Sequence, residues 1–202
     1  MREIERLTPA DARRVRWKNG RGVTEEIAVS PRGARFEHGD FDWRVSRARV
    51  AEDGPFSAFP GFERILVVTS GAGLVLSHGD DAPRARLRGL EPYRFSGDWT
   101  TRGELVAGGV ADFNVVFRRG AVVASVEALR LGRRRALEVV GPGDALVHVV
   151  AGALAARAPR EEAPYELEEG DSLLLRGLAG EEELDLAGAR EGTAALLVRL
   201  AR

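Results

Sequence analysis

Short hydrophobic stretches separated by turn residues recur along nearly the whole chain. They begin at Val23, Trp43, Arg64, Gly73, Phe113, Ala121, Ala145, Ala153, Asp171 and Ala194. Apolar or alternating runs of about four to eight residues, bounded by Gly, Pro, Asn and Asp, predict β-strands rather than helices. One short helix is expected over residues 8–14, with Thr8 as N-cap and Pro9 at the first helical position. The pattern therefore predicts an all-β protein with one helical turn.

The second half of the chain repeats the pattern of the first. The segment "ILVVTSGAGLVL" at 65–76 resembles "LVHVVAGALAA" at 146–156, and each reads as a strand, a turn at a glycine and a second strand. Leu90 and Leu167, and the strand ends at Arg119 and Arg202, recur with the same period of about 80 residues. Two copies are too few for a solenoid, so two jelly-roll barrels are predicted, at 1–119 and 120–202. A single β-sandwich with chance similarity is the alternative.

One predicted strand carries an arginine on its apolar side. Side chains alternate along a strand, so "WRVSRARV" divides into one face with Arg44, Ser46, Ala48 and Val50 and another with Trp43, Val45, Arg47 and Arg49. We expect the face with Arg47 and Arg49 to lie in solvent, and the opposite face, which carries Arg44, to point to the interior. A buried guanidinium requires a paired charge and acceptors for its N–H groups. Either Glu26 or Asp112 forms an internal bridge with it, or a bound carboxylate shares it.

Composition restricts the classes of partner. The 202 residues are 44% hydrophobic and 30% charged, enough for sizeable cores, and the formal net charge of −1 provides no field for attracting nucleic acid. No apolar run approaches the roughly 20 residues that cross a bilayer, and the N-terminus lacks the apolar segment of a signal peptide. We expect a cytoplasmic protein with no nucleic-acid or membrane partner.

Familiar catalytic and cofactor motifs are missing. Cysteine is absent, which excludes disulfides, thiolate metal sites and a cysteine nucleophile. The histidines, His38, His78 and His148, are isolated, whereas metal-binding barrels cluster theirs on neighbouring inward positions. No dinucleotide or phosphate-binding glycine loop and no G-x-S-x-G turn occurs. The sequence therefore predicts neither a metal nor another cofactor.

The first half instead combines polar residues with aromatics and rigid turns. Asn19 precedes a glycine, so it is either a turn residue or a ligand contact, and Trp17 and Trp99 either line a pocket or pack in a core. Arg64, after the Gly- and Pro-rich segment 53–63, is either a second cation for a ligand or solvated. The candidate ligand-binding residues are Trp17, Asn19, Thr24, Glu26, Arg44, Ser46, Arg64, Asp112 and Asn114.

Several of these segments together resemble one family. "WKNGRGVTEEI" from Trp17, "WRVSRARV", "DGPFSAFPGFER", "FSGDW" and "DFNVVFRRG" occur in the order typical of HutD/Ves proteins, with "RG" in place of "GG" after Asn19 as a small departure. The resemblance implies a bicupin, two RmlC-like jelly rolls in one chain. It also implies a link to histidine utilisation and binding of a small acidic metabolite such as N-formylglutamate, with no established catalysis.

Three hypotheses follow. The first is a metal-free regulatory or accessory protein whose N-terminal barrel binds a small anionic metabolite through charge-assisted hydrogen bonds. The second is a cofactor-free isomerase or lyase with Glu26 as base and Arg44 stabilising an enolate. The third is a structural or protein-partner module without a ligand, in which barrel edges form a homodimer.

Overall fold

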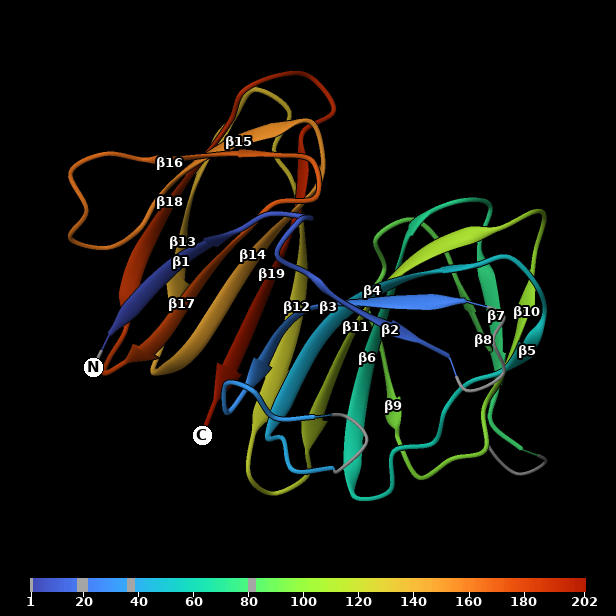
Figure 1. Ribbon diagram of the computed structural model, residues 1–202. Helices are drawn as coiled ribbons and strands as arrows, with labels where there is room; N and C mark the ends of the chain where they lie inside the picture. Colours follow the sequence, from blue (N-terminus) through green and yellow to red (C-terminus); the bar gives the residue numbers. More distant parts are fainter. Residues whose placement is uncertain (1, 18–21, 36–38, 80–82) are drawn as a thin grey trace. The chain divides into compact units, whose positions relative to one another are not determined.

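The computed structural model describes residues 2–17, 22–35, 39–79 and 83–202, and every regular element in these ranges is a β-strand (Figure 1). The strands form two compact units. We call Ala12–Val122 the first barrel, and Met1–Asp11 together with Val123–Arg202 the second barrel. Each barrel contains two antiparallel sheets. No helix in the described ranges is long and apolar enough to cross a membrane.

The first barrel pairs a six-stranded sheet with a four-stranded one. The larger sheet has, in order, β2 (Arg13–Arg16), β3 (Val23–Ser30), β4 (Trp43–Val50), β11 (Val110–Arg118), β6 (Phe62–Ser70) and β9 (Tyr93–Ser96). The smaller sheet has β5 (Gly54–Pro55), β10 (Arg102–Leu105), β7 (Leu74–Ser77) and β8 (Ala85–Leu87). Leu66, Val68, Leu74 and Leu76 are fully buried in its core. Each buried side chain of this size stabilises the fold by about 1.5–3 kcal/mol.

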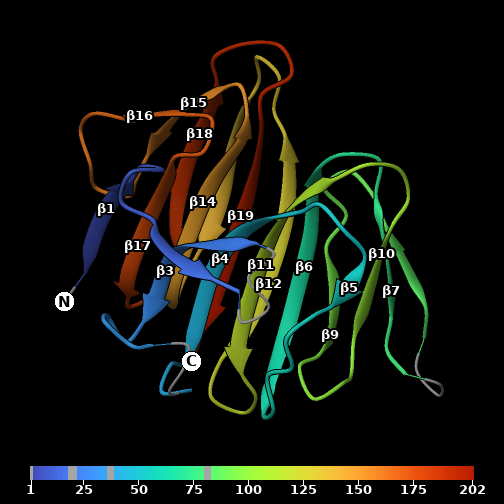
Figure 2. The ribbon, with the colours of Figure 1, turned by 45° about the vertical axis from the view of Figure 1, so that its right-hand side comes forward.

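The second barrel repeats this arrangement. Its larger sheet runs β1 (Glu3–Leu7), β17 (Ser172–Leu178), β14 (Gly143–Ala151), β19 (Ala194–Ala201) and β12 (Val123–Arg130). Its smaller sheet runs β13 (Arg135–Val140), β18 (Glu182–Gly188), β15 (Ala153–Arg157) and β16 (Tyr165–Glu168). The order β4-β11-β6-β9 thus recurs as β12-β19-β14-β17, which can be followed in Figures 1 and 2. The predicted duplicated jelly roll is confirmed.

The repeated glycines have a structural reason. Gly71 joins β6 to β7 and Gly152 joins β14 to β15, with φ values of 96° and 82° that L side chains rarely adopt. A Cβ on Gly71 would lie 2.6 Å from the carbonyl oxygen of Gly109, and one on Gly152 would lie 2.6 Å from Thr193 Oγ1. Both turns therefore require glycine, which explains why this landmark is visible in both halves of the sequence.

The predicted helix over residues 8–14 is wrong. The chain makes a turn in which the Asp11 carboxylate accepts hydrogen bonds from the Thr8 N–H at 2.8 Å and from Thr8 Oγ1 at 2.7 Å. These bonds hold the pKa of Asp11 below its usual value. Strand β2 then begins at Arg13. An isolated helix this short has no stability of its own, and the sheet pairing of β2 with β3 competes successfully with it.

The two barrels also differ in extent from the predicted domains 1–119 and 120–202. Strand β1 pairs with β17, in a register from Glu3 opposite Arg176 to Leu7 opposite Ser172. The Arg6 guanidinium reinforces the pairing, with Nη2 donating to Asp171 Oδ2 at 2.7 Å. The N-terminal strand therefore belongs to the second barrel, and the first barrel is a continuous segment inserted between β1 and β12.

Candidate functional site

Three adjacent strands of the first barrel bring the predicted polar residues onto one interior surface. Across β4, β11 and β6, the register places Arg44, Val116 and Arg64 in one row, Ser46, Asn114 and Leu66 in the next, and Ala48, Asp112 and Val68 in the third. On β3, Glu26 lies opposite Ser46 and Thr24 opposite Ala48. Since side chains two residues apart share a face, the cations stand at one end of this surface and Asp112 at the other.

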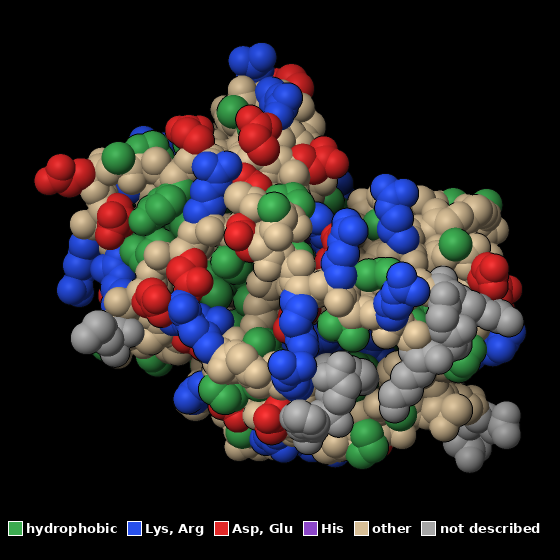
Figure 3. Space-filling view, in the orientation of Figure 1, with side chains coloured by type: hydrophobic (Ala, Val, Ile, Leu, Met, Phe, Trp, Pro, Cys, Tyr) green, Lys and Arg blue, Asp and Glu red, His purple; other side chains and the backbone are tan. Residues whose placement is uncertain are grey.

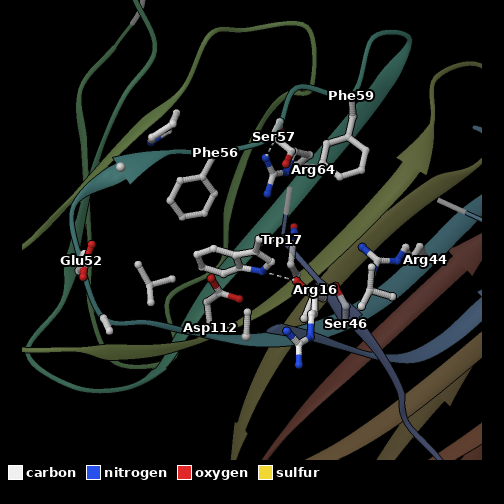
Figure 4. Close-up of a pocket in the computed structure, with 18 of the residues that line it drawn as sticks. Arg16, Trp17, Arg44, Ser46, Glu52, Phe56, Ser57, Phe59, Arg64 and Asp112 are labelled. Carbon is white, nitrogen blue, oxygen red and sulfur yellow. Dashed lines mark hydrogen bonds between the residues drawn. The ribbon is translucent and has the colours of Figure 1, made fainter. Parts of the chain in front are cut away.

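A cavity of about 350 Å³ opens over these rows (Figure 4). This volume lies within the range of small-molecule sites. The predicted residues that line it are Trp17, Thr24, Arg44, Ser46, Arg64, Asp112 and Asn114. Glu26 is buried behind Arg44 and does not line the cavity. Asn19 lies outside the described residues.

Arg44 is held in place by a carboxylate. Its Nε donates to Glu26 Oε2 at 2.6 Å, and both side chains are buried. Arg13, the neighbour of Glu26 across β2 and β3, donates to the same carboxylate from Nε at 3.0 Å and from Nη2 at 3.2 Å. One negative charge thus serves two guanidinium groups. The internal bridge proposed for Arg44 exists, and it orients an arginine that also faces the cavity.

Arg64 is a buried cation without a paired carboxylate among the described residues. Its side chain sits among the rings of Phe56, Phe59 and Phe95, with Cζ 5.5, 5.0 and 4.9 Å from the three centroids. Nη1 donates to the Ser57 carbonyl oxygen at 3.0 Å, while Nε is buried and has no hydrogen-bond partner in the described ranges. Burial lowers the pKa of Arg64 to about 10, so the group stays charged at neutral pH.

Asp112 stands at the opposite end of the rows. Burial raises the pKa of its carboxyl to about 7, against the opposing effects of the Arg64 charge and of a hydrogen bond with the Ala48 backbone. Two residues along the same face of β11, Asn114 Oδ1 is buried without a hydrogen-bond partner among the described residues. The middle and far rows of this surface therefore present side-chain oxygens that can accept hydrogen bonds, in contrast to the cationic end.

Trp17 lies across the cavity, above Asp112 in the view of Figure 4. Its indole Nε1 donates to Thr24 Oγ1 at 2.9 Å. Gly22 allows this position, because a Cβ there would lie 2.9 Å from the indole ring. Trp17 therefore contributes to the pocket, which is one of the two roles that the sequence allowed. Trp99 does not line the cavity; its ring is 5.0 Å from that of His78.

Sequence reasoning missed the aromatic residues of the loop 53–63. Phe56, Ser57 and Phe59 line the cavity and surround Arg64. The loop is fixed by backbone hydrogen bonds from Phe56 N–H to the Thr101 oxygen at 2.9 Å and from Phe59 N–H to the Gly97 oxygen at 2.8 Å. The high density of Gly, Pro and Phe indicated an ordered loop. The sequence of the loop does not indicate which rings point inward, because side chains on an irregular backbone do not alternate between two faces as they do on a strand.

The buried histidines have structural partners. His78 Nδ1 is 2.9 Å from Thr101 Oγ1 and its Nε2 is 3.2 Å from the Tyr93 hydroxyl, and burial lowers the pKa of this imidazole. In the second barrel, His148 Nδ1 is 2.9 Å from Ser172 Oγ. No group of three or more His, Cys, Asp or Glu side chains that could hold a metal ion occurs within the described ranges. His38 lies outside them.

Comparison with known proteins identifies the family. The HutD family model matches residues 9–196. The chain belongs to the HutD family. Among curated relatives, Protein Ves from Citrobacter koseri is 35% identical over 138 residues, which is 68% of each chain. An uncharacterized 21.2 kDa protein in the hutC 3' region of Pseudomonas putida is 36% identical over 117 residues, covering 58% of this chain and 60% of that protein.

Solved structures agree with this HutD assignment. A conserved protein of unknown function from Pseudomonas aeruginosa PAO1 has a TM-score of 0.89 and 31% identity, covering 99% of this chain and 100% of that one. HutD from Pseudomonas fluorescens SBW25, in a formate condition, has a TM-score of 0.82 and 29% identity over 98% of each chain. The similarity thus includes both barrels and not only the motif-rich first half.

Proposed function

We propose that this HutD protein is an accessory or regulatory protein of histidine utilisation whose first barrel binds a small acidic metabolite such as N-formylglutamate. The family supports the link to the pathway, since one relative is a hutC-region protein and another is named HutD. The chemistry of the ligand rests on the cavity. The cavity combines an apolar and aromatic lining with a few polar side chains, among them Arg44, Arg64 and Asp112, which is the usual composition of a small-molecule site.

The observation that carries the proposal is the state of Arg64. Leaving a buried charged donor unsatisfied costs about 1–3 kcal/mol or more, and a bound carboxylate would offset this cost. Arg44 stands in the same cross-strand row, with Val116 between them, so the two backbones are roughly 10 Å apart. Two long side chains at this separation can converge on one anionic group or hold two.

The enzyme hypothesis loses its base in this arrangement. Glu26 accepts hydrogen bonds from Arg13 and Arg44 and does not line the cavity. Both of its oxygens are engaged by guanidinium N–H groups, so Glu26 is not placed to reach a ligand in the cavity. The geometry therefore favours binding over proton abstraction by Glu26.

A thermal-shift and calorimetric titration with N-formyl-L-glutamate tests the proposal. We expect the wild-type melting temperature to rise with ligand, and we expect Arg64→Met to weaken binding by about 10- to 100-fold, the value of one or two charge-assisted hydrogen bonds. Methionine preserves volume among the three phenylalanine rings, so the variant should remain folded.

Arg49→Met is the matched control. Arg49 lies on β4 of the same sheet, is exposed and does not line the cavity, so its replacement should leave the titration unchanged. Absence of binding to the wild-type protein by N-formyl-L-glutamate and by simpler mono- and dicarboxylates would refute the proposed function.

A further inference from the structure

The interior surface of the first barrel is chemically divided along β11. Val116, at the cationic end, lies between Arg44 and Arg64, whereas Asn114 and Asp112 follow toward the other end on the same face. At a rise of about 3.4 Å per residue, the Asp112 backbone is roughly 13 Å from that of Val116, and Asn114 is midway. A ligand over these rows meets donors at one end and acceptors at the other.

The acceptor end is incompletely satisfied. A carboxylate can accept about four hydrogen bonds. Among the residues that the structure describes, Asn114 Oδ1 is buried and accepts none. The nearby Asp112 side chain has a hydrogen bond with the Ala48 backbone, is largely buried and faces the cavity. Buried oxygen acceptors normally find donors, so Asn114 Oδ1 indicates a donor that the protein itself does not supply, and Asp112 can accept from the same group.

A plain dicarboxylate would not supply that group. Its polar atoms at neutral pH are carboxylate oxygens, which accept hydrogen bonds and cannot donate one to Asp112 or Asn114. An N–H group would instead donate a hydrogen bond to Asp112 and would lower the free-energy cost of burying its ionised form.

We infer that Asp112, assisted by Asn114, selects ligands that carry an N–H donor near their carboxylate, so that the ligand class is N–H-bearing carboxylic acids rather than simple dicarboxylates. This inference rests on the proposed function, because it assumes that a carboxylate occupies the arginine end. It assigns Asp112 a role in specificity that the arginines cannot fulfil, since any carboxylate satisfies them.

Two nearly isosteric probes test the inference. N-formyl-L-glutamate presents an amide N–H, and 2-(formyloxy)pentanedioate has an ester oxygen at the same position. Calorimetric titration of the wild-type protein at pH 8, where the Asp112 carboxyl is mostly ionised, should show at least about tenfold tighter binding of the amide, because a hydrogen bond to a charged acceptor is lost in the ester. Comparable affinities for the two probes would overturn the inference while leaving the proposed function intact.

Variants locate the effect at Asp112. Asp112→Leu, similar in volume, should bind both probes with similar affinity, and Asp112→Asn, which keeps one oxygen acceptor, should retain part of the preference. Arg64→Met should weaken both probes equally, because they share their carboxylates. A preference for the amide that persists in Asp112→Leu would overturn the inference, and binding of neither probe to the wild-type protein would overturn the proposed function and this inference with it.

Discussion

At the scale of single residues, the first barrel buries an arginine and an aspartic acid in one cavity without joining them in an ion pair. Arg64 and Asp112 face the same cavity and influence each other's pKa, yet Arg64 forms its hydrogen bond with the Ser57 carbonyl. Asp112 lies four residues along β11 from Val116, the residue opposite Arg64, which is too far for a direct bridge. Burying both groups without an ion pair costs stability, which is the pattern expected where function and stability compete.

The raised pKa of Asp112 makes stability depend on pH. The pKa of this carboxyl is 3.8 in an unfolded chain and about 7 in the folded protein, so between these pH values the unfolded chain loses a proton that the folded protein keeps. Stability should therefore fall as pH rises from about 4 to about 7 and then level off. Asp112→Asn should remove this contribution.

Urea unfolding of the wild type and of Asp112→Asn at pH 4.5 and pH 8 measures the contribution of Asp112 to the pH dependence of the free energy of unfolding. The variant should gain a few kcal/mol relative to the wild type at the higher pH. Other groups, including His78, titrate in both proteins and cancel in the difference. An equal difference at both pH values would contradict the prediction.

At the scale of elements, the loop 53–63 determines the shape of the cavity although it contributes little regular structure. Gly97, next to β9, permits its close approach: a Cβ there would lie 2.5 Å from the Phe59 oxygen and 2.8 Å from the Phe62 oxygen. These oxygens belong to the backbone, so they cannot move aside to accommodate a Cβ as the end of a flexible side chain could. The position of Phe59, and with it the packing around Arg64, therefore depends on a glycine outside the loop.

Gly97→Ala should displace the loop, lower stability by about 1–3 kcal/mol and weaken binding of N-formyl-L-glutamate. Gly89→Ala is the control, since a Cβ there meets no atom within 4 Å. Melting temperature and ligand titration of the two variants provide the comparison. If Gly97→Ala bound ligand as tightly as Gly89→Ala, the loop would not be positioned as described.

The sequence predicts features that depend on local side-chain alternation, and it does not predict features that depend on contacts between distant segments. Arg44 could be placed inside because alternation on β4 is local, and Asp112 and Asn114 could be assigned to one face for the same reason. Strand β1 could not be predicted: "EIERL" has three charged residues in five, and its partner β17 is far away in the sequence. The contact of the phenylalanines with Arg64 could not be predicted either, because tertiary contacts determine how a loop orients its side chains.

At the scale of the whole molecule, the repeat has diverged in chemistry while the topology has been kept. The second barrel fills the interior of its larger sheet with aliphatic side chains, and Val147, Leu173, Leu175 and Leu197 are fully buried there. The first barrel places arginine, asparagine and aspartate at interior positions. On the outside, acidic and basic side chains are mixed over the visible face (Figure 3). Duplication thus supplied one barrel for packing and one free to acquire a site.

Deletion of residues 2–8 tests the strand assignment. Loss of β1 should expose the edge of β17 and remove the Arg6 partner of buried Asp171, and so destabilise the second barrel. Hydrogen exchange should show reduced protection in β17, whereas N-formyl-L-glutamate should still bind the first barrel. Unchanged protection in β17 would contradict the pairing.

The placement of β1 also has a consequence for biosynthesis. Its partner strand ends at Leu178, so β1, which is made before the whole first barrel, must wait until that barrel and most of the second have been synthesised before it can pair. The inserted first barrel is contiguous and can mature in the meantime. Synthesis therefore completes the first barrel before the second, and the second barrel folds fully only when β1 joins strands made much later.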